Sequence, residues 1–240
     1  MRVSRLVSAP NWRYAVGEGV LIVVGVTIAL AATSWYEGQQ ERRDEILILQ
    51  QLRQTLSEDL QDINMTWEMT RQRERNITAL LDHLESDSPY TAELGVKFQS
   101  LLGWRIVRIK TAPFEALKVQ GYKVISNAVL REKLISFYED HFARLEYNLN
   151  LDRDFAIEKV QPYFFENLVM RVAGSNDVDG GAQEWVPRDY DKIRAEPYIA
   201  NLCRFRADLI RRFALRQYAS TTAAIYEILD EIDRELAGAN

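Results

Sequence analysis

The sequence predicts an all-α protein in which one N-terminal transmembrane helix precedes an extracytoplasmic helical bundle. Three observations predict this fold. An uncharged apolar run lies near the N-terminus, apolar residues recur at helical spacing through most of the chain, and only 11 of the 240 residues are Gly and 6 are Pro. Because no stretch alternates clearly between apolar and polar residues, we expect no β-sheet.

The transmembrane helix is predicted over residues 14–36. No charged residue occurs from Gly19 to Trp35, and the whole stretch is long enough, since about 20 helical residues cross a bilayer. Aromatic residues prefer the two membrane interfaces, and they flank this run at both ends. These flanking residues are Trp12, Tyr14, Trp35 and Tyr36. The lipid bilayer is therefore a predicted partner of the chain.

Basic residues around the span predict its orientation. Those nearest to it are Arg2, Arg5 and Arg13 before it and Arg42 and Arg43 after it. Cytoplasmic flanks carry the excess of Lys and Arg, so we expect the N-terminus in the cytoplasm. The prediction is a single-pass protein of the bacterial inner membrane. Residues 1–13 form a short cytoplasmic tail, residues 14–36 the span, and residues 37–240 an α-helical soluble domain in the periplasm.

A cleaved signal peptide is the alternative interpretation of this segment. Ala29-Leu30-Ala31 fits the small-residue pattern of a cleavage site, and a basic region precedes the apolar run. Against cleavage, the basic region is long and includes Glu18, and the aromatic pair Trp35-Tyr36 would have no role. We therefore expect the span to be retained.

Two features inside the span are candidates for function. Glu18 lies in its first turn, where an acid is costly unless it reaches headgroup water near Arg13 or a partner. Gly25, Ala29 and Thr33 recur every four residues, which allows two helix backbones to approach closely. Small residues are also common in such helices without any dimer, so both interpretations remain open.

The soluble part begins with a long helix that is free of Gly and Pro from Gln39 to Glu85. Its apolar face is predicted at Leu49, Leu52, Leu56, Leu60, Ile63 and Trp67, continuing at Ile77, Leu81 and Leu84. The spacing is close to 3.6 residues, which indicates a helix packed in a bundle rather than a coiled coil. A loop follows at residues 86–89.

Four further segments follow the loop. A second helix buries Leu94, Phe98, Leu101 and Leu102, and a short one runs from Pro113 to Gly121. Asn127 is the expected N-cap of a helix that reaches Val172, with a bend at Pro162. Residues 173–194 are expected to be irregular. The last helix runs from Pro197 to Leu236, with inner residues at Ile199, Leu202, Phe205, Leu209, Phe213, Ile225, Leu229, Ile232 and Leu236.

The sequence predicts no catalytic, cofactor or metal site, so we expect no enzyme. His83 and His141 belong to no Glu-x-x-His or His-Glu-x-x-His motif, and neither a phosphate-binding loop nor a Gly-x-Ser-x-Gly elbow occurs. The run 175–180 resembles half of a calcium loop, but its closing position is Val186, which favours an ordinary acidic turn. Cys203, the only cysteine, is predicted to be a buried hydrophobe. A net charge of −5 argues against nucleic acid as a partner.

The last helix carries a candidate interaction ridge. Arg204, Arg211 and Arg212 could share one face and contact lipid headgroups or an acidic partner. The ordinary alternative is a solvated face with intrahelical pairs, such as Arg204 with Asp208 four residues on.

Two stretches carry a resemblance to a known family. The first runs from Tyr14-Ala15-Val16-Gly17-Glu18 through the span to Trp35, and the second from Phe114-Glu115-Ala116-Leu117-Lys118 to Tyr138. Together they resemble an uncharacterised bacterial family of single-pass membrane proteins, the domain of unknown function numbered six-zero-nine-zero. Members usually have Asn-Asn before the tryptophan, where Thr33-Ser34 stand here. The resemblance implies the anchor and the fold, and no activity.

Two functions fit these features. The first is a membrane-anchored helical interaction or scaffold protein of the bacterial cell envelope, whose partner is another envelope protein or a second copy in a homo-oligomer. The alternative is an extracytoplasmic sensor domain that binds a small molecule. Its pocket could be lined by Tyr163, Phe164, Phe165 and Trp185, which are otherwise expected in the core.

Overall fold

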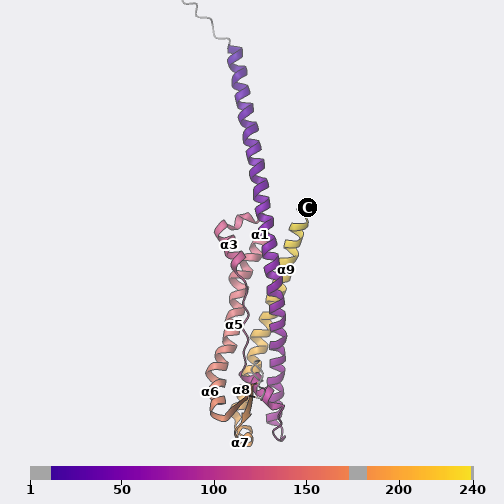
Figure 1. Cartoon of the computed structure of the whole chain (residues 1–240), viewed down its shortest axis with the longest axis vertical. Coiled ribbons are helices and arrows are strands. Elements are labelled where there is room, and N and C mark those ends of the chain that lie inside the picture. The colour runs from indigo at the N-terminus through magenta and orange to yellow at the C-terminus, as the bar shows by residue number, and fades with distance from the viewer. Residues whose placement is uncertain (1–11, 173–182, 239–240) are drawn as a thin grey trace, which may run out of the picture. The chain divides into compact units, whose positions relative to one another are not determined.

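The computed structural model describes residues 12–172 and 183–238 (Figure 1). Their backbone is mostly helical, as predicted, and the chain divides into two compact units, residues 1–48 and 49–240. The first helix, α1, runs from Trp12 to Glu85 and contributes to both units. Each unit is described separately below.

In the first unit, α1 contains a segment long and apolar enough to cross a membrane. No part of this segment is buried against other residues, and its Val, Ile and Leu side chains are exposed. The hydroxyl groups of Thr27 and Thr33 donate to the backbone carbonyls of Val23 and Ala29, four residues earlier. Such internal bonds are what a lipid environment requires, because it offers polar groups no water.

The second unit packs around the part of α1 that begins at Leu49. Leu49, Leu52, Leu56 and Ile63 are fully buried and Leu60 nearly so, as the periodicity predicted. Two details were wrong. Leu80 rather than Leu81 continues the buried face. Trp67 is only half-buried, and the Arg71 guanidinium lies 4.9 Å from the centre of its ring.

Among the described residues, shorter helices complete the second unit. The α-helices are α2 (Leu94–Leu102), α3 (Ala112–Gln120), α4 (Ala128–Ser136), α5 (Phe142–Phe155), α6 (Gln161–Asn167), α7 (Tyr190–Ala195), α8 (Pro197–Leu209) and α9 (Arg216–Ala237). A 3₁₀ turn, η1, covers Tyr122–Val124, and π-helical turns η2 (Phe137–His141), η3 (Ala156–Val160) and η4 (Ile210–Leu215) join α4 to α5, α5 to α6 and α8 to α9. The π turns keep these segments continuous while changing which side chains face the core.

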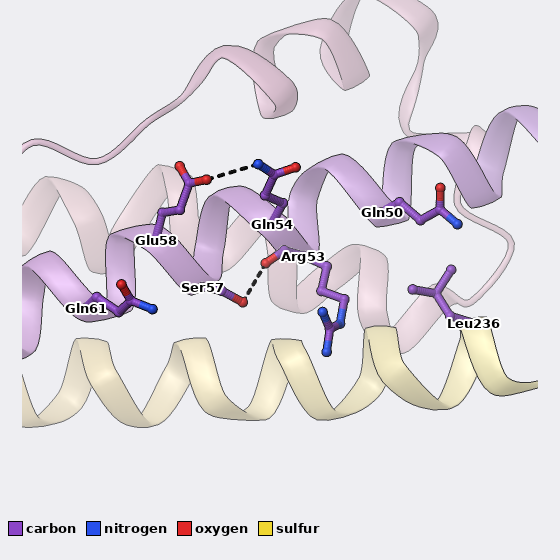
Figure 2. A pocket seen from close by; sticks show the side chains of 7 residues that line it. All are labelled: Gln50, Arg53, Gln54, Ser57, Glu58, Gln61 and Leu236. Carbon is purple, nitrogen blue, oxygen red and sulfur yellow. Dashed lines mark hydrogen bonds between the residues drawn. The ribbon is translucent and has the colours of Figure 1, made fainter.

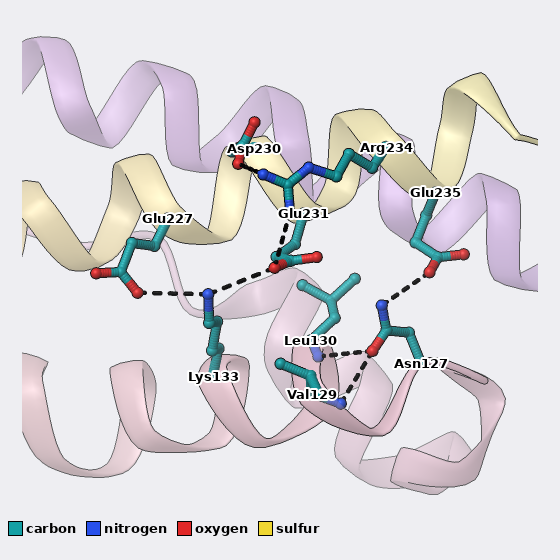
Figure 3. A network of polar contacts seen from close by, with 9 residues as sticks. All are labelled: Asn127, Val129, Leu130, Lys133, Glu227, Asp230, Glu231, Arg234 and Glu235. Carbon is teal, nitrogen blue, oxygen red and sulfur yellow. Dashed lines mark hydrogen bonds and ion pairs between the residues drawn. The ribbon is translucent and has the colours of Figure 1, made fainter.

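The ends of α3 and α4 follow the predicted capping chemistry. Gly121 ends α3 with a φ of 93°, a conformation that favours glycine. The side-chain oxygen of Asn127 accepts from the backbone N–H groups of Val129 and Leu130, which makes it the N-cap of α4. Its amide also donates to Glu235 of α9 at 2.8 Å (Figure 3). The cap therefore also links α4 to α9.

Figure 3 shows the polar contacts that continue this link along the two helices. The Lys133 ammonium lies 3.3 Å from a Glu227 carboxylate oxygen and 3.6 Å from one of Glu231. Arg234 in turn pairs with Glu231 and with Asp230. These side chains are partly or fully exposed to solvent, so each ion pair adds little to the stability of the contact between α4 and α9.

A two-stranded hairpin corrects the expectation of no β-sheet. The helix expected to reach Val172 ends at Asn167, and β1 (Leu168–Val172) pairs antiparallel with β2 (Gln183–Pro187). Trp185 of β2 packs edge to face on Phe164 of α6, with ring centres 5.4 Å apart. Neither Leu-Val-Met-Arg-Val nor Gln-Glu-Trp-Val-Pro alternates between apolar and polar residues, so the sequence pattern does not distinguish these strands from helix.

The predicted inner face of the last helix was partly wrong. Ile199, Leu202 and Leu209 are buried, as are Ile225 and Ile232. Phe205 and Phe213, however, are 56% and 46% exposed, and Leu229 and Leu236 are only partly buried, with Ile228 buried instead. Arg206 takes the buried place next to Phe205. Cys203 is buried as predicted, and burial raises the pKa of its thiol to about 12, so it stays protonated.

Replacement of Leu56 by Ala tests which face of α1 is buried. Because Leu56 is fully buried, we expect Leu56→Ala to cost about 2–5 kcal/mol of unfolding free energy. The measurement is a urea melt, followed by circular dichroism, of a fragment from Gln39 to Asn240. Arg53→Ala and Glu58→Ala should leave the midpoint nearly unchanged, since both side chains are exposed. An unchanged midpoint for Leu56→Ala would contradict the packing of α1.

Candidate functional site

A cluster of buried charged side chains lies at the centre of the second unit. Arg206 of α8 is fully buried, Asp152 of α5 is 1% exposed, and Arg73 of α1 is 7% exposed. Charged side chains are almost never fully buried unless they are paired. The cluster is therefore the first place to look for a function.

The Asp152 carboxylate joins the two guanidinium groups. Arg73 donates from Nη2 to Asp152 Oδ2 at 2.5 Å, and Arg206 donates from Nε to Asp152 Oδ1 at 3.0 Å. Each carboxylate oxygen thus has its own arginine. Charge-assisted bonds in a water-poor interior are strong, so Asp152 ties α1 and α8 to α5.

Backbone carbonyls at the end of α2 complete the cluster. Arg206 donates to the carbonyl oxygens of Leu101 and Gly103, and Arg73 donates to Gly103 O at 2.7 Å. The C-terminus of a helix carries partial negative charge, which favours nearby cations. The two arginines therefore also hold the end of α2 in place.

The cluster nevertheless holds two full positive charges and one full negative charge. Burial lowers the pKa of the Arg206 guanidinium, while Asp152 opposes that change. Arginine stays protonated in proteins, so the imbalance remains. Burial raises the pKa of the neighbouring Tyr218 phenol to about 12, so this group stays neutral beside the cluster. The buried site is thus electropositive.

A cleft of about 410 Å³ opens beside this cluster. Arg73 forms part of its wall, so the electropositive site reaches the cleft. The other residues that line it are Met69, Gln72 and Asn76 of α1, Val96, Gln99 and Ser100 of α2, and Gly103, Trp104 and Arg105 of the segment that follows α2. It combines polar, apolar and cationic side chains.

Two other hollows offer less chemistry. Figure 2 shows a groove of about 560 Å³ between α1 and α9, lined by Leu236 and six polar residues of α1. Arg53, one of these, pairs with Asp233 of α9 at 2.5 Å. A third hollow of about 340 Å³ lies beside Tyr163, whose hydroxyl is 3.5 Å from a Glu196 carboxylate oxygen. Neither contains a buried charged cluster among the described residues.

The four aromatic residues considered for a sensor pocket do not line one cavity. Phe164 and Trp185 are buried against each other in the core. Phe165 is 61% exposed, and of the four only Tyr163 borders one of the hollows described above. Their main role in the structure is to pack α6 against the hairpin.

The predicted basic ridge is a set of paired charges. Arg204 pairs with Glu85, Arg211 with Glu74, and Arg212 with Asp208. The intrahelical pair expected between Arg204 and Asp208 thus forms with Arg212 instead. All three arginines remain exposed, but each already has an acidic neighbour within the second unit.

The predicted anchor residues lie along the exposed part of α1. The side chains of Trp12 and Tyr14 lie outside the described residues. Glu18, Gly25, Ala29, Trp35 and Tyr36 are all exposed. Added atoms at Gly25 would meet nothing within 4 Å, so this face is open to lipid or to another helix.

The described residues contain no group of three or more His, Cys, Asp or Glu residues that could hold a metal ion. His83, in the last turn of α1, lies 3.0 Å from the carbonyl oxygen of Pro89 in the loop that follows. The calcium-like run 175–180 lies outside the described residues.

Sequence reasoning missed the buried charged cluster. One signal could have found Arg73. The apolar face of α1 is interrupted between Ile63 and Ile77. The buried positions continue there at helical spacing, but they are the polar residues Thr66, Thr70 and Arg73. A polar interval in an otherwise apolar stripe indicates buried polar residues that need partners. Asp152 carries a similar signal, because it takes one position in the buried stripe of Leu145, Leu149, Ala156 and Val160.

Comparison with known proteins places the chain in a family. Residues 18–183 match the model described as "Family of unknown function (DUF6090)", which is more than half of the chain. The chain belongs to this family. The DUF6090 match begins in the apolar part of α1 and includes Arg73, Gly103 and Asp152, whereas Arg206 lies beyond it. No curated protein and no solved structure matches the chain.

Two substitutions test the charge imbalance of the cluster. Asp152→Asn would leave two buried cations without a counter-charge, so we expect it to cost about 3–5 kcal/mol of unfolding free energy. Arg206→Met would leave the neutral Arg73–Asp152 pair and lose hydrogen bonds, so we expect a smaller cost of about 1–3 kcal/mol. Urea melts of the Gln39–Asn240 fragment measure both. A larger cost for Arg206→Met would contradict an excess of positive charge.

Proposed function

We propose that this DUF6090 protein is a membrane-anchored helical interaction or scaffold module of the bacterial cell envelope. The observation that carries the proposal is the exposed apolar part of α1. Its side chains pack against no other part of the described chain, and exposing so much apolar surface to water is unfavourable. The segment crosses the inner membrane once, and the lipid of the bilayer covers this surface.

The orientation follows from the charges on either side of the span. Arg2, Arg5 and Arg13 precede it without any acid before Glu18, which supports a cytoplasmic N-terminus. Residues 49–240 are then extracytoplasmic. This unit uses one buried cysteine and no disulfide, so its core does not depend on the redox state of the compartment.

Exposed aromatic residues on α8, η4 and α9 support a role in binding another protein. Phe205, Phe213 and Tyr226 are each about half exposed. The rings of Phe205 and Phe155 lie 4.8 Å apart, so a partner would meet a paired aromatic surface there. Aromatic side chains are enriched at protein interfaces, where they contribute much of the binding energy. The partner is another envelope protein or a second copy of the chain.

A second candidate function, a small-molecule-binding sensor domain, is favoured by the cleft beside Arg73. Ligand sites are typically concave, with apolar walls and a few convergent polar groups. The cleft has both, together with a charged side chain from the buried cluster.

The orientation is tested by a reporter fused after Asn240. An enzyme that is active only outside the cytoplasm should be active at this position, because the basic flank retains the N-terminus inside. The same enzyme fused to a variant whose residues Arg2, Arg5 and Arg13 are replaced by Glu serves as the comparison, and its activity should fall. Activity of a cytoplasm-only reporter on the unaltered chain would reverse the orientation.

The interaction role is tested by photo-crosslinking in intact cells. A benzophenone amino acid at Phe205 or Phe213 should give discrete protein adducts, since both positions are exposed and apolar. The same probe at Ala223, an exposed position on α9, is the control. An adduct of twice the chain's mass indicates a homo-oligomer, and any other discrete mass a different protein. Equal adducts at Ala223, or none at either phenylalanine, would argue against this surface.

A further inference from the structure

The wall of the Arg73 cleft carries more positive charge than the neighbouring acidic side chains balance. None of the ten described residues that line it is acidic, whereas both Arg73 and Arg105 are cationic. Arg73 shares its only carboxylate partner among the described residues, Asp152, with Arg206. Arg105 is exposed and forms no ion pair with any residue in the described part of the chain. The carbonyl groups at the end of α2 supply only partial negative charge.

Two side chains of the Arg73 cleft also have buried polar atoms without hydrogen-bond partners. Arg73 Nε and Gln99 Oε1 are both buried, and neither has a hydrogen-bond partner among the described residues. Both side chains line the cleft. The other polar side chains there are engaged, since Gln72 donates to Asn76 and Asn76 donates to Ser100. A buried polar atom without a partner is costly, so an unmade bond at a cleft wall indicates a missing ligand or water.

The remaining walls are apolar. Trp104, Met69 and Val96 line the cleft and are each more than a third exposed. Trp104 offers a flat aromatic face, and Met69 a flexible and polarisable side chain that adapts to different shapes. A bare inorganic anion would leave these three side chains unused.

We infer that this cleft binds a small organic carboxylate that has an apolar or aromatic body. Its carboxylate lies toward Arg73 and Arg105, and its body lies against Trp104, Met69 and Val96. The volume of about 410 Å³ is in the range of small-molecule sites, which span about 300–1,000 Å³. The two arginines disfavour an organic cation by charge repulsion. The inference deepens the second candidate function and does not depend on the protein partner.

The test uses the full chain in nanodiscs of phosphatidylcholine, with fluorotryptophan in place of Trp, and fluorine NMR. The Trp104 resonance is assigned by its loss in Trp104→Phe. Phenylacetate should shift this resonance saturably, with a dissociation constant in the millimolar range or below. Acetate lacks the apolar body and 2-phenylethanol lacks the charge, so both should bind roughly tenfold more weakly or worse. Equal affinity for 2-phenylethanol would overturn the inference.

Two matched variants locate the anion. Arg105→Gln removes an exposed cation of the cleft and should weaken phenylacetate roughly tenfold without changing thermal stability. Arg108→Gln removes an exposed cation of the same segment outside the cleft and should change nothing. No saturable shift, or equal effects of the two variants, would overturn the inference. So would parallel, unsaturating shifts of Trp104 and Trp35, which would indicate uptake into the bilayer. Crosslinking at Phe205 is unaffected by any of these results.

Discussion

The second unit depends on one carboxylate. Asp152 is the only acidic side chain among the described residues that contacts the buried guanidinium groups of Arg73 and Arg206. Through these two arginines it connects α5 with α1, with α8 and with the end of α2. Burying three charges costs more than packing apolar residues of the same volume. The gain is geometric, because the planar N–H groups of each guanidinium donate in fixed directions, and their oxygen partners come from different helices.

The same constraint explains the composition of α1. A helix can bury Leu and Ile against any apolar surface, and it does so from Leu49 to Ile63 and again from Ile77. Between them it faces Asp152 and the carbonyl groups that follow α2, and it presents Thr66, Thr70 and Arg73. The polar interval is therefore not a weak part of the core. It is the place where apolar packing gives way to hydrogen bonds that specify position.

Features that depend on local chemistry could be predicted from the sequence. The buried face from Leu49 to Ile63, the cap at Asn127 and the apolar segment of α1 each follow from a few neighbouring residues. Features that depend on partners distant in sequence could not. Apolar periodicity placed Phe205 inside, but Arg206 is buried because Asp152 and two carbonyl groups lie opposite it. The hairpin was missed for the same reason, since its strands exist only through their pairing.

The excess positive charge links stability to ligand binding. The cluster holds one more cation than anion, and part of that charge borders the Arg73 cleft. An anion in the cleft would offset the charge that makes the cluster costly, so it would bind the folded state and stabilise it by mass action. A better balanced cluster would be more stable alone and would attract an anion less strongly. The unbalanced positive charge at Arg73 therefore lowers the stability of the fold and at the same time favours binding of an anion. Binding sites commonly retain arrangements that are locally unfavourable for stability.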